Sequence, residues 1–195
     1  MTKKMADIAE EMGVIFHYNT PVEKISVDRK RVDGLHINGS VIKPDVTIVN
    51  ADFAHAMTTL VDDSDRKRWS DKKLDKSRYS CSTYMLYLGI EGKYDLPHHQ
   101  IYISSDYRGN LNDIHGSEQL TWNDPSFYAQ NVAATDSTMA PEGHSTVYVL
   151  VPVGNTKGDI DWSEEEPKFR ELILDQLERI GFKDLRSRIR SQTVT

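Results

Sequence analysis

Hydrophobic residues recur along this chain at two spacings, and each spacing predicts one kind of secondary structure. A spacing of three to four positions predicts amphipathic helices, at residues 5–12, 53–60 and 162–180. Alternating or continuous runs of β-branched and aromatic residues predict strands, at residues 14–18, 22–27, 32–37, 40–43, 45–50, 80–90, 100–104, 128–133 and 146–153. Helices and strands are therefore interspersed, and we expect an α/β fold with some α+β character.

The first part of the chain predicts a three-stranded antiparallel meander. Asn38-Gly39 separates two of the strand patterns and is typical of a type I′ hairpin turn. The pattern at residues 45–50 is nearly continuous in apolar residues, as in a strand buried on both faces. Residues 62–78 are densely charged, which predicts helical turns on a solvated surface. Because the pattern changes near Asp52, we expect one structural unit at 1–52 and a second unit at 53–195.

The second part of the chain predicts a mixed sheet with flanking helices. A connection rich in Asp, Ser, Pro and Gly, residues 135–145, joins two strand patterns and indicates a hairpin or two neighbouring strands. Asp161 or Ser163 can cap the helix at 162–180, and Gly181 can end it. A short helix at 184–189 and a strand beginning at residue 192 are expected to follow.

Composition narrows the class of protein. The chain has 195 residues, 38% of them hydrophobic, and a net charge of −6, which allows a sizeable core and argues against electrostatic binding of nucleic acid. The sequence contains no apolar run of about 18 residues, the length that a membrane-spanning helix requires. The N-terminus lacks the apolar segment of a secretory signal, and the single cysteine, Cys81, is interpreted as a small buried side chain. These features predict a cytoplasmic protein without disulfides.

Few residues indicate catalysis or metal binding by their pattern alone. The pair His98-His99 suggests a metal site, but neighbouring residues of a strand point to opposite faces. We therefore interpret both as structural or surface histidines and expect no metal. The cluster from Asp106 to Arg108 is either a substrate-side group or, as we favour, a turn in which Arg108 pairs with Asp106 or Asp113.

Residues 13–52, GVIFHYNTPVEKISVDRKRVDGLHINGSVIKPDVTIVNAD, resemble the second FAD-contacting block of flavoproteins that have two dinucleotide-binding domains. In that superfamily a Gly-Val strand leads to a Pro-Val strand, a meander follows, and a buried strand runs back into the nucleotide-binding sheet. The resemblance implies that the backbone of Val22 binds the adenine. It also implies that Asn50, Ala51 and Asp52 lie near the cofactor and that residues 1–52 are part of an FAD-binding domain.

The second half narrows the resemblance to one family, the bacterial-type phytoene desaturases, also called phytoene dehydrogenases. The segments that carry it, in order, are YSCSTYMLYLGI, HHQIYISSDYRGNLNDI, DPSFYAQNVAATDSTMAPEGHSTVYVLVPV and DWSEEEPKFRELILDQLERIGF. Members of this family are FAD-dependent oxidoreductases of carotenoid biosynthesis. The resemblance implies that the full protein transfers hydride from a saturated stretch of polyene to the flavin and so creates a conjugated double bond.

Five tyrosines in the second half are candidates for substrate binding. The resemblance implies that this half forms a substrate domain, in which flat aromatic side chains suit a long polyene without polar groups. The same residues also fit an ordinary sheet core, and both interpretations stay open. The five are Tyr84, Tyr87, Tyr102, Tyr128 and Tyr148.

Two parts of the family pattern do not occur in this sequence. The Gly-x-Gly-x-x-Gly turn, which seats the FAD pyrophosphate on a helix N-terminus, has no match. The C-terminal flavin-contacting segment is absent as well. Residues proposed for catalysis in the family lie in the absent N-terminal part, so no catalytic residue is assigned. We therefore expect an internal fragment of a longer enzyme, one that does not bind FAD tightly by itself.

Other functions remain compatible with the sequence. The substrate could be another isoprenoid or a retinoid, and the reaction a saturation or an isomerisation, because substrate choice depends on tunnel shape. Alternatively, the chain is a non-catalytic binding or assembly module. A fragment should expose apolar surface around Val46, Ile48 and Val49 and could self-associate through it, whereas a free-standing module should have no such patch.

A lipid-soluble polyene substrate also implies peripheral membrane contact of the full protein, on the inner face of the membrane. Lys3, Lys4 and the charged run at residues 66–76 could touch an anionic membrane surface. A solvated helix face explains these cations equally well.

Overall fold

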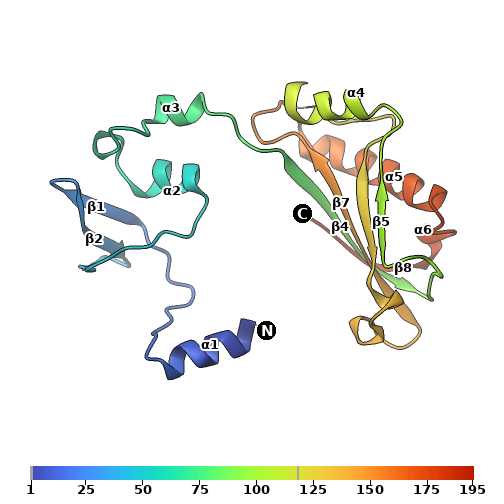
Figure 1. The fold of residues 1–195 in the computed structure, drawn as a ribbon, viewed down its shortest axis with the longest axis horizontal. Coiled ribbons are helices and arrows are strands. Elements are labelled where there is room, and N and C mark those ends of the chain that lie inside the picture. Colours follow the sequence, from blue (N-terminus) through green and yellow to red (C-terminus); the bar gives the residue numbers. More distant parts are fainter. Residues whose placement is uncertain (1, 118) are drawn as a thin grey trace. The chain divides into compact units, whose positions relative to one another are not determined.

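A computed structural model describes residues 2–117 and 119–195, and it divides the chain into two compact units between Arg78 and Tyr79 (Figure 1). The first unit contains a small sheet and short helices. Its elements are α1 (Thr2–Glu11), β1 (Lys24–Asp28), β2 (Arg31–Ile37), β3 (Ser40–Ile42), α2 (Phe53–Leu60), η1 (Asp63–Asp65) and α3 (Asp71–Asp75).

The predicted three-stranded meander is confirmed. The strands lie in the order β1-β2-β3, and both pairings are antiparallel. The φ angles of Asn38 and Gly39 are 48° and 75°, both positive as a type I′ turn requires. Gly34 in β2 leaves no room for a side chain, because an added Cβ would lie 2.6 Å from Cγ1 of Val41.

Two other strands predicted for this unit do not form. Residues 14–18 and 45–50 are irregular, and Val46 and Ile48 are 79% and 88% exposed. A β-strand needs a partner for its backbone N–H and C=O groups. The small sheet ends at β3 and offers these two segments no partner, so their apolar side chains face solvent.

The unit boundary differs from the one predicted near Asp52, because the residues after Asp52 pack against the meander. Ala56 of α2 is 1% exposed and Ile25 of β1 is 5% exposed. Lys24 of β1 also pairs with Asp62 at 2.5 Å. The assignment of one part to FAD and the other to substrate stays a prediction.

The second unit is a five-stranded sheet with the strand order β5-β6-β7-β4-β8. Its elements are β4 (Ser82–Glu91), β5 (His99–Tyr102), α4 (Tyr107–Asn112), η2 (Asp113–Ser117), β6 (Phe127–Asn131), η3 (Val132–Ala134), η4 (Ser137–Met139), β7 (His144–Val153), α5 (Trp162–Arg179), α6 (Leu185–Arg188) and β8 (Ile189–Val194). The predicted neighbours β6 and β7 do pair.

The sheet is antiparallel throughout its described strands, so the predicted mixed sheet is wrong. Parallel neighbours need a connection that crosses a face of the sheet. The connection through α5 leads from β7 to β8, and β4 lies between these two strands and is antiparallel to both. The helix between β5 and β6, α4, lies beyond the strand ends (Figure 1).

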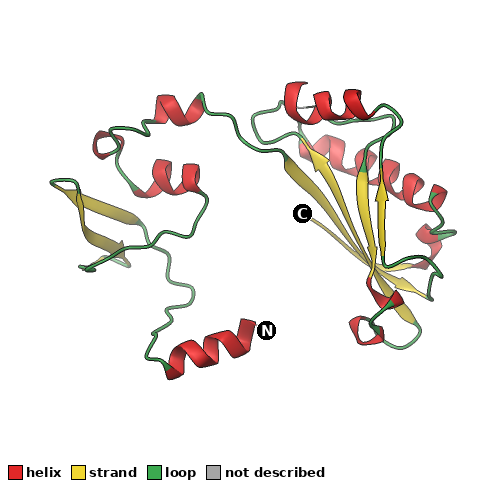
Figure 2. Ribbon diagram, in the orientation of Figure 1, coloured by secondary structure: helices red, strands yellow, loops and turns green. Residues whose placement is uncertain are grey.

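The core of the second unit lies between the sheet and α5, which runs along one of its faces (Figure 2). Phe169, Ile173 and Leu177 of α5 are at most 1% exposed. Alternate residues of the two central strands face this helix and are buried: Tyr84, Leu86, Leu88 and Ile90 in β4, and Ser145, Val147, Val149, Val151 and Val153 in β7. Within the described residues, no helix is both long and apolar enough to cross a membrane.

Candidate functional site

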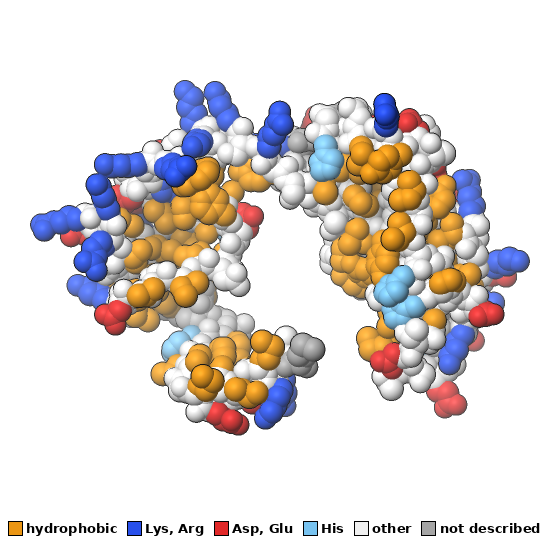
Figure 3. Space-filling model, in the orientation of Figure 1, with side chains coloured by type: hydrophobic (Ala, Val, Ile, Leu, Met, Phe, Trp, Pro, Cys, Tyr) orange, Lys and Arg blue, Asp and Glu red, His pale blue; other side chains and the backbone are white. Residues whose placement is uncertain are grey.

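The second face of the five-stranded sheet carries the other half of each strand's side chains, and these remain partly exposed. Successive residues of a strand point to opposite faces, so the residues between the buried ones gather here. We call this surface the open face. It is formed by Met85, Tyr87, His99, Ile101, Tyr128, Gln130, Tyr148, Leu150 and Thr193. Hydrophobic side chains are visible over the strands of this unit in Figure 3.

Three of the five predicted tyrosines meet at the centre of the open face. The ring of Tyr148 lies 5.3 Å from that of Tyr87 and 6.1 Å from that of Tyr128, between centroids. The Tyr148 hydroxyl donates to the sulfur of Met85 at 3.4 Å. Partial burial and the neighbouring tyrosines raise the pKa of Tyr148, so its hydroxyl stays protonated at neutral pH.

Histidines border the open face at its β5 edge. A ring nitrogen of His99 lies 2.7 Å from the Tyr128 hydroxyl, and one of His98 lies 2.8 Å from Nε2 of Gln130. The two imidazole rings are 4.2 Å apart. The expectation that they point to opposite faces is therefore wrong, because His98 precedes β5 and is not held by strand geometry.

Tyr84 lies on the helix-covered side of the sheet, apart from the other three tyrosines. It is 3% exposed, and its ring stacks 5.8 Å from that of Trp162 and meets the ring of Phe169 edge-on at 5.2 Å. Its hydroxyl donates to Glu166 at 2.9 Å. Burial, followed by this hydrogen bond to a carboxylate, raises the pKa of Tyr84 well above its usual value. The side chain belongs to the core.

Tyr102 also points away from the open face, toward a hydrogen-bonded carboxylate. Its ring stacks on Phe127 at 5.1 Å, and its hydroxyl donates to Asp124 at 2.7 Å. The backbone N–H and the hydroxyl of Ser105 donate to the other oxygen of Asp124, each at 2.7 Å. The hydrogen bond to Asp124 raises the pKa of Tyr102, and partial burial adds to the rise. Asp124 therefore ties the end of β5 to the start of β6.

The residues expected near the cofactor lie in the first unit. Val22 is half-buried and precedes β1, where the N–H of Glu23 donates to the carbonyl of His36 at 2.8 Å. Asn50, Ala51 and Asp52 are exposed. Asp52 is the N-cap of α2, since its carboxylate accepts from the N–H of His55 at 2.8 Å.

Within the described residues the backbone of Val22 forms no hydrogen bond to another backbone group. The sequence has no Gly-x-Gly-x-x-Gly turn for the pyrophosphate. The assignment of Val22, Asn50, Ala51 and Asp52 to the cofactor stays a prediction.

Two other sequence candidates are accounted for by local structure. Asp106 is the N-cap of α4 and accepts from the N–H of Gly109 at 3.0 Å. The predicted pairing of Arg108 with Asp106 or Asp113 does not form. Cys81, predicted to be buried, is a free, half-buried thiol immediately before β4.

Sequence reasoning missed the apolar members of the open face, namely Met85, Ile101 and Leu150. One signal was available in the strand patterns: Tyr84 and Tyr87 are three residues apart on one strand, an odd spacing that places them on opposite faces. Grouping residues from different strands required the pairing register, in which Leu150 lies opposite both Met85 and Tyr128.

Comparison with known protein families gives one match over nearly the whole chain. The model described as flavin containing amine oxidoreductase matches residues 1–194. An oxidoreductase from Methanosarcina mazei has a similar structure, with a TM-score of 0.59 and 14% identity over 97% of this chain and 40% of that one. At 14% identity, this similarity shows a shared fold alone.

Curated relatives are more similar in sequence. A 4,4'-diapophytoene desaturase (4,4'-diapolycopene-forming) from Methylomonas sp is 40% identical over 97% of this chain. An all-trans-zeta-carotene desaturase from Myxococcus xanthus is 40% identical over 98% of it. In each case the matched region is 37% of the relative, so the chain spans less than two fifths of their length.

Proposed function

The chain belongs to the flavin-containing amine oxidoreductase family, and from this premise we propose that it forms the substrate-side part of a carotenoid desaturase. The relatives that it matches over nearly its whole length carry desaturase names. The proposed substrate is a long isoprenoid polyene. Bound FAD would supply the hydride acceptor for this reaction.

The open face is the observation that carries the proposal. A polyene has a flat hydrocarbon chain and offers few groups for hydrogen bonding, so a binding wall for it should be apolar and aromatic. Tyr87, Tyr128 and Tyr148 present ring surfaces, and Met85 and Leu150 lie beside them. Ile101 is 74% exposed at the edge, which extends the apolar wall toward β5.

The exposed apolar segment of the first unit supports the same proposal. Val46, Ile48 and Val49 are 79%, 88% and 43% exposed. This is the apolar surface expected of a chain that works as part of a larger flavoprotein, in which a further sheet would cover it. A free-standing binding module would be expected to bury these three side chains.

The proposal assigns the adenine end of FAD to Val22, with Asn50, Ala51 and Asp52 nearby. The first assignment is supported by the backbone of Val22, which forms no hydrogen bond to another backbone group in the described part of the chain. In the structure Asp52 holds the first turn of α2. The three residues proposed to lie near the cofactor would thereby be linked to α2.

We expect the chain alone to show no saturable binding of FAD in the micromolar range. The reason is that a glycine-rich turn and the helix N-terminus behind it bind the pyrophosphate of a dinucleotide, and the sequence has no such turn. Flavin fluorescence and the melting temperature of the purified chain would be followed during a FAD titration. Saturable micromolar binding would contradict this expectation and assign a complete flavin site to the chain.

The function itself can be tested by exchange of segments. The matched segment of the Methylomonas desaturase would be replaced by this chain, and desaturation of 4,4'-diapophytoene would be measured from the absorbance of extracted products. We expect a flavin-loaded, active chimera. In it, Tyr148→Asp is expected to lower kcat/KM by roughly 60- to 300-fold, since an aspartate in an apolar environment costs about 2.5–3.5 kcal/mol.

A matched control is available in the same unit. Tyr107 lies in α4, is 51% exposed and is not part of the open face. Tyr107→Asp makes the same chemical change there and should leave kcat/KM within twofold of the parent chimera. A chimera that binds flavin but does not desaturate, or a fully active Tyr148→Asp variant, would rule out the proposed role of the open face.

A further inference from the structure

Across β5, β6, β7 and β4, the side chains of the open face fall into two rows. Residues that lie directly opposite one another in an antiparallel sheet are neighbours on the same face. The first row is Ile101, Tyr128, Leu150 and Met85. The second row is His99, Gln130, Tyr148 and Tyr87. Apart from the tyrosine hydroxyls, the hydrogen-bonding side chains of these two rows therefore lie at one end, on β5 and β6.

Four polar side chains form a hydrogen-bonded group at this end, which we call the polar corner: His98, His99, Gln130 and Thr135. Nε2 of Gln130 lies 2.8 Å from Nε2 of His98. An amide nitrogen can only donate, so this ring nitrogen of His98 accepts. The proton of the neutral ring is then on Nδ1, which donates to the hydroxyl oxygen of Thr135. Both nitrogens of His98 are therefore used to hold Gln130 and Thr135.

The polar corner keeps hydrogen-bonding groups that no other described residue occupies. Nδ1 of His99 lies 2.7 Å from the Tyr128 hydroxyl, and its Nε2 has no partner in the described part of the chain. The side-chain oxygen of Gln130 and its second N–H likewise have no partner among the described residues. A donor and an acceptor are therefore both available beside the apolar first row.

A pocket of about 750 Å³ adjoins the polar corner. It is lined by His98 and Thr135, and also by Lys93 and Asp95. The charges of Lys93 and Asp95 are opposite, so this pocket suits an uncharged group better than a carboxylate or a phosphate. In Figure 3, histidine side chains border the hydrophobic surface over the strands of this unit.

A pure hydrocarbon does not account for the polar corner. A hydrocarbon that covers the first row and reaches β5 would displace water from Gln130 and His99 and offer no hydrogen bond in return. Leaving such groups unsatisfied disfavours binding. A polyene that carries an oxygen at its end would satisfy them and keep its apolar part on Leu150 and Met85.

We propose that the polar corner selects an isoprenoid polyene with an uncharged oxygen at its end, in an alcohol or an aldehyde. The apolar part of the substrate would lie along the first row. The terminal oxygen would bind Gln130 and His99, and His98 would hold Gln130 in the orientation that this contact needs.

This inference rests on the proposed function, because both assign the polyene to the open face. Its test measures binding alone and needs neither flavin nor turnover. An inactive desaturase chimera would leave a measured preference for the alcohol standing, and an active chimera would leave the proposed function standing if that preference were absent.

The experiment compares geranylgeraniol with the hydrocarbon that has a methyl group in place of its CH₂OH. Each radiolabelled ligand would be equilibrated with the purified chain, and Kd would be determined after rapid gel filtration. The measured quantity is the Kd of the hydrocarbon divided by that of the alcohol, because a ratio compared between variants is independent of ligand solubility. We expect His99→Phe with Gln130→Met to lower this ratio roughly tenfold, the effect of two modest hydrogen bonds. Gln130→Met alone should lower it roughly threefold.

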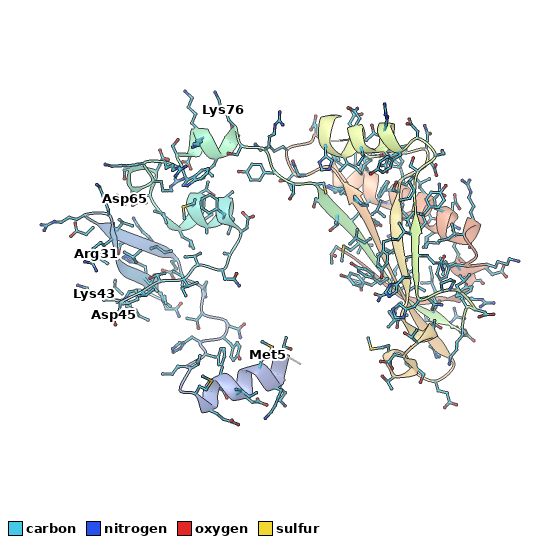
Figure 4. The ribbon with its side chains drawn as sticks, viewed as in Figure 1. Met5, Arg31, Lys43, Asp45, Asp65 and Lys76 are labelled. Carbon is cyan, nitrogen blue, oxygen red and sulfur yellow. The ribbon has the colours of Figure 1, made fainter. Side chains whose placement is uncertain are left out.

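The matched control makes the same two changes elsewhere, by His36→Phe with Gln192→Met. His36 lies in β2 of the first unit, the strand that begins at Arg31, which Figure 4 labels. Gln192 of β8 lies opposite Leu88 and so belongs to the helix-covered side of the large sheet. This control should leave the ratio within twofold of the parent. Circular dichroism would verify that all variants fold.

Four results would overturn the inference. They are a ratio that the polar-corner variants leave unchanged, an equal fall in the control, a parent chain that binds neither ligand, and tighter binding of geranylgeranoic acid than of geranylgeraniol. The last result would assign the end group to Lys93 as an anion.

Discussion

Phe169→Ala is expected to lower the free energy of unfolding of the second unit by about 4 kcal/mol, the upper part of the range for a large buried side chain. Phe169 is 1% exposed, and its ring lies within 6.3 Å of three other aromatic rings, those of Tyr84, Trp122 and Trp162. Removing it leaves a cavity between α5 and the sheet, and rigid aromatic neighbours are poorly able to fill it. Urea unfolding followed by tryptophan fluorescence would measure the change.

Tyr107→Ala provides the control for this substitution. Tyr107 is 51% exposed on α4, so its removal should change the free energy of unfolding by less than about 0.5 kcal/mol. If Phe169→Ala cost no more than Tyr107→Ala, then α5 would not be packed on the sheet as described. The circular dichroism midpoint should agree with the fluorescence midpoint if the unit unfolds in one step.

Asp124→Ala is expected to cost about 3 kcal/mol, because it leaves several hydrogen-bond donors without an acceptor. The carboxylate accepts from the Tyr102 hydroxyl, from the backbone N–H and hydroxyl of Ser105, and from Gln176 of α5 at 3.4 Å. Hydrogen bonds to a charged group are stronger than neutral ones. Urea unfolding would again give the free energy.

The stability that Asp124 provides should depend on pH. Partial burial alone would raise the pKa of Asp124, but the hydrogen bonds from Tyr102 and Ser105 outweigh it and leave the pKa below its usual value. A carboxyl group with a lowered folded-state pKa stabilises the fold fully above its unfolded pKa of about 3.9, and this stabilisation is lost as the pH falls through the folded-state pKa.

The comparison of the parent chain with Asp124→Asn isolates this effect, because asparagine keeps the shape and loses the charge. The difference in unfolding free energy should be constant from about pH 7 to pH 5 and should shrink below about pH 4. A difference that stayed constant down to pH 2.5, or one that grew on acidification, would show that the charge of Asp124 does not act through these hydrogen bonds. Such a result would also remove the basis for the large loss expected of Asp124→Ala.

Local sequence patterns were sufficient to predict most of the helices and strands. The helices α1, α2 and α5 lie within two or three residues of their predicted ranges, as do the strands of the meander and most strands of the large sheet. These elements satisfy their own hydrogen bonds or pair with a neighbour across a short turn, so nearby residues decide them. The segment at 45–50 has an equally strong apolar pattern but no strand partner among the residues that the structure describes, and it is irregular.

The candidate site could be predicted only in part. The aromatic residues of the second half were recognised as a group, but their division between two faces was not. Tyr102 is separated from the open face because its neighbour Ile101, and not Tyr102 itself, lies opposite Tyr128. Hydrogen bonding between strands far apart in the sequence sets that register, and side-chain composition carries little information about it.

The sequence by itself determined the types of elements, the hairpin turn at Asn38, the charged run at residues 62–78 and the family resemblance, because each depends on residues that are near one another in the chain. Only the tertiary structure decided that α5 covers one face of the large sheet and leaves Tyr87, Tyr128 and Tyr148 together on the other. Burial of apolar area against the helix selects the covered face, and the strand order then brings residues from β4, β6 and β7 side by side. A binding surface built from several strands depends on that packing as much as on its residues.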